Sequence, residues 1–127
     1  MAAPQLSPDQ LVGILRDTIT TLVRKDGADL SARQLAVFLI CYLNEGGHTV
    51  RGLAQTLNIS KPAITRALDR LAELDYIRRK VDLHDRRSIL VQRTVRGAAF
   101  LREMRHIMSN AVTANKSEAT SRRSAAA

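Results

Sequence analysis

The stretch Val50–Arg93, which reads VRGLAQTLNISKPAITRALDRLAELDYIRRKVDLHDRRSILVQR, decides the fold of this chain. Its first half has the apolar spacing of helices, and its second half holds two runs rich in β-branched, aromatic and basic residues. This order predicts a short helix at 51–57, a turn, and a second helix at 61–74. Two strands at about 76–81 and 88–93 follow, joined by a polar loop.

The second helix carries a start signal and two unlike faces. Ser60 is a good N-cap, and Pro62 fits a first turn in which no backbone N–H is needed. Helical spacing predicts a buried stripe of Ile64, Leu68 and Leu71. The opposite face is cationic and hydroxyl-bearing toward its N-terminal end and holds Lys61, Pro62, Thr65, Arg66, Asp69 and Glu73. Such a helix suits insertion into a DNA major groove.

The two strands and their loop predict a hairpin, residues 76–93, that we call the wing. The loop Asp82-Leu83-His84-Asp85-Arg86-Arg87 has no glycine and ends in two arginines. Guanidinium groups bind phosphates and enter narrow minor grooves, where negative potential is concentrated. The predicted fold is therefore mainly α with a small β-hairpin (α+β), a winged helix-turn-helix.

These residues resemble the DNA-binding core of the MarR (multiple antibiotic resistance regulator) family. The resemblance covers roughly residues 49–101. It rests on LAQTLNISKPAITRALDRLAELDYIRR, on the wing signature Asp85-Arg86-Arg87, and on Thr94-Val95-Arg96-Gly97, which is similar to the family's T-x-x-G start of the next helix. The family usually has glycine where this chain has Asp75. Aspartate tolerates a left-handed helix end better than most residues, so we expect the turn to be kept.

The resemblance implies a DNA-binding transcriptional regulator that forms a homodimer through its first and last helices. The first helix has an apolar stripe of Leu11, Ile14, Leu15, Ile19, Leu22 and Val23. This stripe packs either in the chain's own core or against a second subunit, and the resemblance favours the subunit. Full-length relatives use a further C-terminal helix to build a crevice for small aromatic ligands. This chain resembles a short member, so a small-molecule effector is left open.

The composition agrees with a polyanionic partner. The formal net charge is +8, and residues 60–96 hold ten Lys/Arg against five Asp/Glu. Aromatic residues are only 3%, which argues against a single-strand binder that stacks bases. The chain has no bilayer-spanning apolar run, no signal-peptide pattern and one cysteine. We therefore expect a cytoplasmic protein without a membrane partner.

Capping signals place the remaining helices. Ser7-Pro8-Asp9-Gln10 and Ser31-Ala32-Arg33-Gln34 are capping boxes that predict helices at about 8–25 and 32–44. Thr94 is expected to cap a helix at 95–112, and His48-Thr49-Val50 is a candidate third strand. Residues 1–6 and 113–127 lack an apolar pattern and predict a flexible arm and a flexible tail. One winged helix domain would then span 7–112.

Catalysis, a metal and a cofactor are not predicted. His48, His84 and His106 are scattered, and no Cys/His set has zinc spacing. Cys41 has no charged residue within four positions before it, and Glu45 follows four positions later. This setting predicts a buried, inert thiol rather than a redox sensor.

The predicted DNA-binding residues are Ser60, Lys61, Pro62, Thr65, Arg66, Arg70, Asp85, Arg86 and Arg87. Thr65 and Arg66 are the candidates for base edges, whereas Lys61 and Ser60 are expected on phosphates. Asp85 is expected to orient a neighbouring arginine through a charge-assisted bond. The alternatives are an ordinary solvated helix face, a winged helix that binds an acidic protein, and an architectural DNA binder without sequence specificity.

Overall fold

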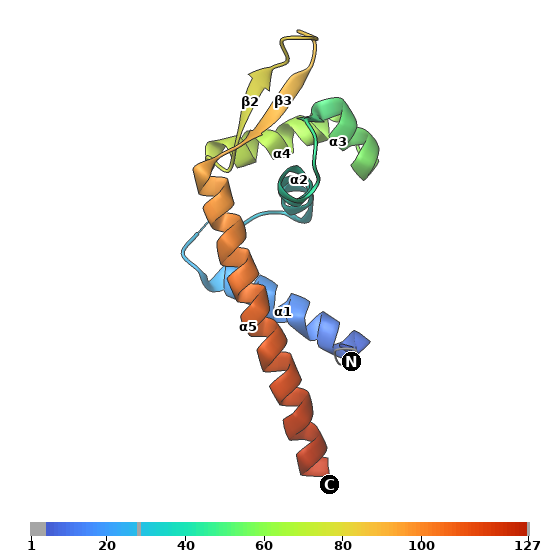
Figure 1. The fold of residues 1–127 in the computed structure, drawn as a ribbon, viewed down its shortest axis with the longest axis vertical. Helices are drawn as coiled ribbons and strands as arrows, with labels where there is room; N and C mark the ends of the chain where they lie inside the picture. The colour runs from blue at the N-terminus through green and yellow to red at the C-terminus, as the bar shows by residue number, and fades with distance from the viewer. Residues whose placement is uncertain (1–4, 28, 127) are drawn as a thin grey trace. The chain divides into compact units, whose positions relative to one another are not determined.

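The computed structural model describes the backbone of residues 5–27 and 29–126 and the side chains as far as Ser117. Along the chain the elements are α1 (Pro8–Arg24), α2 (Ala32–Leu43), β1 (His48–Thr49), α3 (Val50–Leu57), α4 (Lys61–Glu73), β2 (Ile77–Val81), β3 (Ile89–Arg93) and α5 (Val95–Ala126) (Figure 1). They form two compact units rather than the single domain expected over 7–112. One unit joins α1 to α5 from Arg102 onward, and the other holds residues 30–101.

The end of α5 corrects the sequence prediction. The helix was expected to stop at 112, with a flexible tail over 113–127, but it continues to Ala126. Residues 113–126 contain no glycine or proline, so loss of the apolar pattern does not end the helix. Asn115 lies within this extension and is buried. Of the predicted arm, Gln5 and Leu6 are in neither helix nor strand, and residues 1–4 lie outside the described residues.

A polar contact fixes the pairing of α1 with α5. The Asn115 amide nitrogen donates to the Asp17 carboxylate at 2.8 Å and to the Ala111 carbonyl at 2.7 Å. Gly13 lies directly beneath the Asn115 side-chain oxygen, which would overlap a Cβ at position 13. A buried amide with both bonds made in this way favours one register of the two helices.

Only part of the apolar stripe of α1 is buried. Ile14 and Thr18 are covered, as are Met104, Ile107 and Ala111 of α5. The larger apolar side chains of α1 are exposed; they are Leu11, Val12, Leu15, Ile19 and Val23. This unit therefore leaves an apolar surface uncovered in the single chain.

The unit of residues 30–101 has its own core. Its largest fully buried side chains come from four elements and are Val37, Phe38, Cys41, Leu53, Ile64, Leu68, Leu71 and Ile77. The sheet is antiparallel with strand order β1-β3-β2, which confirms the third strand expected at His48–Thr49. In Figure 1 the β2–β3 hairpin projects beyond α3 and α4. The fold is therefore the predicted winged helix-turn-helix.

Tyr42 of α2 joins the base of the wing to the start of α5. Its hydroxyl donates to the Tyr76 carbonyl at 2.6 Å and accepts from the Thr94 N–H at 3.0 Å. The Thr94 hydroxyl donates to the Asp75 carbonyl and accepts from the Gly97 N–H, so Thr94 caps α5 as predicted. A Cβ at Gly97 would overlap both the Tyr42 hydroxyl and the Tyr76 carbonyl.

The turn after α4 keeps its left-handed residue without glycine. Asp75 has φ = 59°, which confirms the expectation for this position. The Asp75 N–H donates to the Ala72 carbonyl, and the Tyr76 N–H donates to the Leu71 carbonyl. This pair of bonds is a Schellman ending, and it directs the chain from α4 into β2.

Candidate nucleic-acid interface

The two faces of α4 separate as its sequence predicts. Ile64, Leu68 and Leu71 are fully buried. Thr65 and Arg66 are exposed, together with Lys61, Pro62 and Asp69. The helix is thus anchored through one side and presents a hydroxyl, two cations, a proline and one carboxylate on the other. An α-helix anchored in this way can enter a major groove.

Two of the predicted site residues have internal partners. The Ser60 hydroxyl oxygen accepts the Ala63 N–H at 3.2 Å, so Ser60 is the expected N-cap of α4. Arg70 lies 3.4 Å from the Glu73 carboxylate, and its side chain is only partly exposed. Arg70 is therefore a weaker candidate for a DNA contact than Arg66, whose side chain is exposed.

The wing loop is held by its own carboxylates. The Asp82 carboxylate accepts the His84 N–H at 2.9 Å, and the Asp85 carboxylate accepts the Arg87 N–H at 3.1 Å. The other Asp85 oxygen accepts the Ser88 hydroxyl at 3.3 Å. Asp85 thus organises the loop that carries the two arginines, and its expected role of orienting a guanidinium group stays a prediction. Arg86 and Arg87 are both exposed on this loop.

An ion pair links the wing to α4. The Arg79 guanidinium of β2 lies 2.5 Å from the Asp69 carboxylate on the outer face of α4. At the base of the same strand, Arg78 lies 3.6 Å from Asp75. These contacts restrain the hairpin relative to the helix, so that both present their cations in a set arrangement.

A cleft of about 560 Å³ lies where α3, α4 and the wing meet. Its lining includes Thr49, Arg51, Lys61, Thr65, Asp85 and Arg87. Four of these residues are predicted site residues, so the structure brings the N-terminal end of α4 and the wing tip to the same side of this unit. Exposed cations around one cleft concentrate positive potential there.

Sequence reasoning missed five residues of this cleft, and two of them, Thr49 and Arg51, lie at the start of α3. Thr49 caps α3, since its hydroxyl oxygen accepts the Gly52 N–H at 3.0 Å. Arg51 stands in the first turn of α3 and is exposed. An arginine at a helix N-terminus within a helix-turn-helix was a usable signal, because both the guanidinium and the helix start attract anions.

Cys41 is the buried thiol that its sequence setting predicts. It is 2% exposed, and burial raises the pKa of the thiol to about 11. The positive charge of Arg93 lowers the pKa of this thiol, but its effect is smaller than that of burial. The Arg93 guanidinium instead donates to the Cys41 carbonyl at 2.9 Å at the end of α2. Cys41 therefore lacks the exposure that a redox sensor needs.

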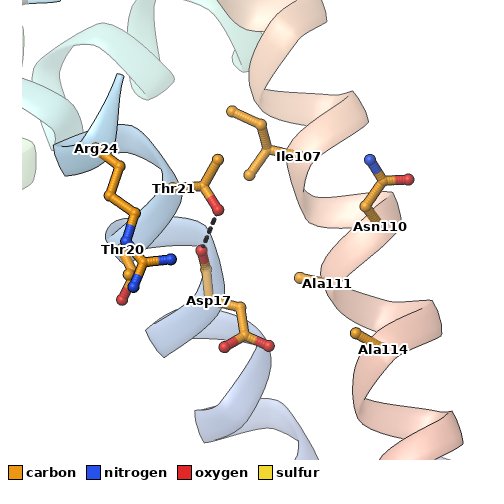
Figure 2. Close-up of a pocket in the computed structure, with 8 residues that line it drawn as sticks. All are labelled: Asp17, Thr20, Thr21, Arg24, Ile107, Asn110, Ala111 and Ala114. Atoms are coloured by element: carbon orange, nitrogen blue, oxygen red, sulfur yellow. Dashed lines mark hydrogen bonds between the residues drawn. The ribbon is translucent and has the colours of Figure 1, made fainter. Parts of the chain in front are cut away.

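A second pocket, of about 310 Å³, lies between α1 and α5 (Figure 2). Its α5 side is Ile107, Asn110, Ala111 and Ala114, and its α1 side is Asp17, Thr20, Thr21 and Arg24. The Thr21 hydroxyl donates to the Asp17 carbonyl at 2.8 Å. The Arg16 guanidinium, and then the Asn115 amide, lower the pKa of the Asp17 carboxyl. The volume is at the lower end for ligand sites, and the small-molecule effector stays a prediction.

Within residues 5–27 and 29–117, no group of three or more His, Cys, Asp or Glu side chains is placed to hold a metal ion. No helix in the described part of the chain is both long and apolar enough to cross a bilayer.

The fold and the cleft together define a winged helix-turn-helix. The MarR family model matches residues 28–88, which contain α2, α3, α4 and the wing loop. Among curated proteins, none matches this chain by sequence.

Solved structures extend the likeness beyond the matched segment. A transcriptional regulator from Thermotoga maritima superposes with a TM-score of 0.72 at 19% identity, over 87% of this chain and 75% of its own. The crystal structure of MarR superposes with a TM-score of 0.61 at 28% identity, over 81% of this chain and 75% of its own. A mutant MarR from E. coli, complexed with operator DNA, superposes with a TM-score of 0.63 at 24% identity, over 83% of this chain and 71% of its own.

Residues 28–88 are thus similar to the MarR family, and the chain shares its fold with solved structures of that family's regulators.

Proposed function

We propose that this protein is a sequence-specific regulator that binds double-stranded DNA. The observation that supports this proposal most directly is the cleft, which is lined by Lys61 and Thr65 of α4 together with Arg87 of the wing. The N-terminal half of α4 would enter the major groove, with Thr65 and Arg66 beside base edges. Arg86 and Arg87 would contact the backbone or an adjacent minor groove. The likeness to a MarR protein complexed with operator DNA supports DNA as the partner.

The proposal includes a homodimer formed through α1 and α5. The exposed apolar side chains of α1, among them Leu11, Leu15 and Ile19, support it. A symmetric contact would cover these residues, and burying apolar area contributes about 25 cal/mol per Å². Two copies of α4 would then read half-sites about one helical turn apart. A cytoplasmic location is part of the same proposal, and the single cysteine, which cannot form an internal disulfide, is compatible with it.

Selection of bound sequences from random duplexes tests the proposal in one experiment. We expect enrichment of a pseudo-palindrome whose half-sites are about 10 base pairs apart. Recovery of duplex without enrichment would replace this function with an architectural role. No recovery of duplex at low salt would contradict the proposal and would favour a winged helix that docks on an acidic protein.

A further inference from the structure

We propose that the cleft between α3 and the wing holds one backbone phosphate of the bound duplex, clamped by Arg51 and Arg87. This inference rests on the proposed DNA binding and names a contact that joins the first helix of the helix-turn-helix to the wing. The cations of the lining are Arg51, Lys61 and Arg87, and its one carboxylate is Asp85. The formal charge of this lining is therefore 3 − 1 = +2.

The single carboxylate of the cleft already accepts hydrogen bonds from its own loop. One Asp85 oxygen accepts the Arg87 N–H at 3.1 Å, and the other accepts the Ser88 hydroxyl at 3.3 Å. Asp85 therefore holds the loop that carries Arg87 while its charge is partly satisfied by loop donors. Thr49 is occupied in a similar way, because its hydroxyl oxygen caps α3 at the Gly52 N–H. The three cations are left to attract an incoming anion, and the two arginines are the ones that can bind it through paired N–H donors.

The chemistry of these groups selects phosphate. A guanidinium presents planar pairs of N–H donors that match phosphate oxygens, and charge-assisted bonds of this kind are the strong ones. Two guanidinium groups approaching from different elements can share the oxygens of one phosphate. Lys61 would add positive potential at the side of the cleft nearest α4.

The size and position of the cleft point to a phosphate within a polymer. A volume of about 560 Å³ is far larger than one phosphate ion, so an ion by itself would leave most of the space to water. The same space is bordered by Thr65 on the outer face of α4. A strand of duplex whose phosphate lies in the cleft would therefore run beside the face that reads bases, and the clamp would set its register.

Ethylation interference on the selected duplex tests this clamp, using Arg51→Gln, Arg87→Gln and the double variant. Ethylation neutralises one phosphate at a time, so each contacted phosphate is recognised by depletion from the bound fraction. We expect wild-type protein to show one interfering phosphate per half-site that disappears in both single variants. Loss at two different phosphates, or at none, would overturn the shared clamp.

Affinity gives a second readout. Each single variant is expected to bind every duplex roughly fivefold more weakly at 0.15 M salt, with a salt slope smaller by about one. The double variant should lose less than the product of the single losses, because both arginines serve one phosphate. Arg33→Gln is the matched control, since Arg33 is exposed in the first turn of α2 and outside the cleft. An equal loss in Arg33→Gln, or fully multiplicative losses, would contradict the clamp.

Two controls distinguish the shared phosphate clamp from a site for a free anion and from a failure of DNA binding as a whole. Inorganic phosphate is compared with chloride at matched ionic strength as a competitor for duplex. Equal competition is expected, whereas a phosphate-specific effect that Arg51→Gln abolishes would assign the cleft to a free anion instead. If wild-type protein binds no duplex, the proposed function fails. If wild-type protein binds and Arg51→Gln binds equally well, only the clamp fails.

Discussion

Arg79 of the wing and Asp69 of α4 form an ion pair at 2.5 Å across the junction of hairpin and helix. Both side chains are partly exposed, so the pair is worth at most about 1 kcal/mol of stability. Its importance lies in geometry, because it ties the strand that leads to the wing arginines to the helix that carries Thr65 and Arg66.

Asp69→Asn is therefore predicted to reduce specificity more than affinity. Removal of a negative charge should strengthen binding to any duplex, while loss of the tie should weaken the preference for the selected site. Glu73→Gln is the matched control, since it also removes one negative charge from the end of α4, where Glu73 pairs with Arg70. Titration of both variants with selected and scrambled duplexes measures specificity as the ratio of the two affinities. Identical ratios for the two variants would show that the tie has no role in binding.

Gly97→Ala is predicted to destabilise the unit of residues 30–101 by about 1–3 kcal/mol or more. The added methyl group would overlap the Tyr42 hydroxyl and the Tyr76 carbonyl, and the second of these is backbone. The gain in helix propensity, about 1 kcal/mol, is smaller than this cost. Gly27→Ala is the control, because a Cβ there meets nothing within 4 Å. Urea denaturation measures both variants, and equal stability of the two would contradict the described packing.

The contact between Gly13 and Asn115 predicts a reversal of sign. In the wild-type background, Gly13→Ala should destabilise the protein by about 1–2 kcal/mol, because Asn115 must leave its bonds to Asp17 and Ala111. In an Asn115→Ala background the obstacle is gone. The same Gly13→Ala change should then stabilise by up to about 1 kcal/mol through helix propensity. Thermal unfolding of wild type, the two single variants and the double variant completes this double-mutant cycle. Additive effects on stability would exclude this pairing of α1 with α5.

The raised pKa of Cys41, about 11 against an ordinary 9.0, predicts a loss of stability in alkali. Below pH 9 the thiol is neutral in both folded and unfolded protein. Between pH 9 and 11 only the unfolded chain releases the proton, so the free energy of unfolding falls by up to about 1.4 kcal/mol per pH unit. Cys41→Ala should remove this part of the slope. Denaturation at pH 8, 9 and 10 measures it, and parallel curves would mean that the thiol is not buried.

Local signals explain why so much of the winged helix was predictable. The Ser60 cap, the spacing of Ile64, Leu68 and Leu71, and the left-handed Asp75 each depend on a few neighbouring residues, and each is found as expected. Charged residues that face outward on such a helix could also be named in advance. Their exposure follows directly from the burial of the opposite face.

Features that depend on distant partners escaped prediction. The last helix continues past 112 although its apolar pattern ends, and its buried Asn115 bonds to Asp17, 98 residues away in the sequence. The carboxylate of Asp85 could have turned to an arginine or to the loop backbone, and only the folded loop decides between them. Arg51 lines the cleft because α3 meets the wing; its place in the first turn of α3 was a local signal, but the proximity of the wing was not.

The most direct test of the central claim is a titration of fluorescent duplex with wild-type protein and with Arg66→Ala across a salt series. Wild-type protein should prefer its selected site over scrambled duplex, and the logarithm of its affinity should fall with a slope of about −0.9 per phosphate contacted. Arg66→Ala should lose about 1–3 kcal/mol of that preference while it keeps the salt slope. Absence of duplex binding by wild-type protein at 50 mM salt, or an unchanged preference in Arg66→Ala, would contradict the assignment of α4 as the helix that reads DNA.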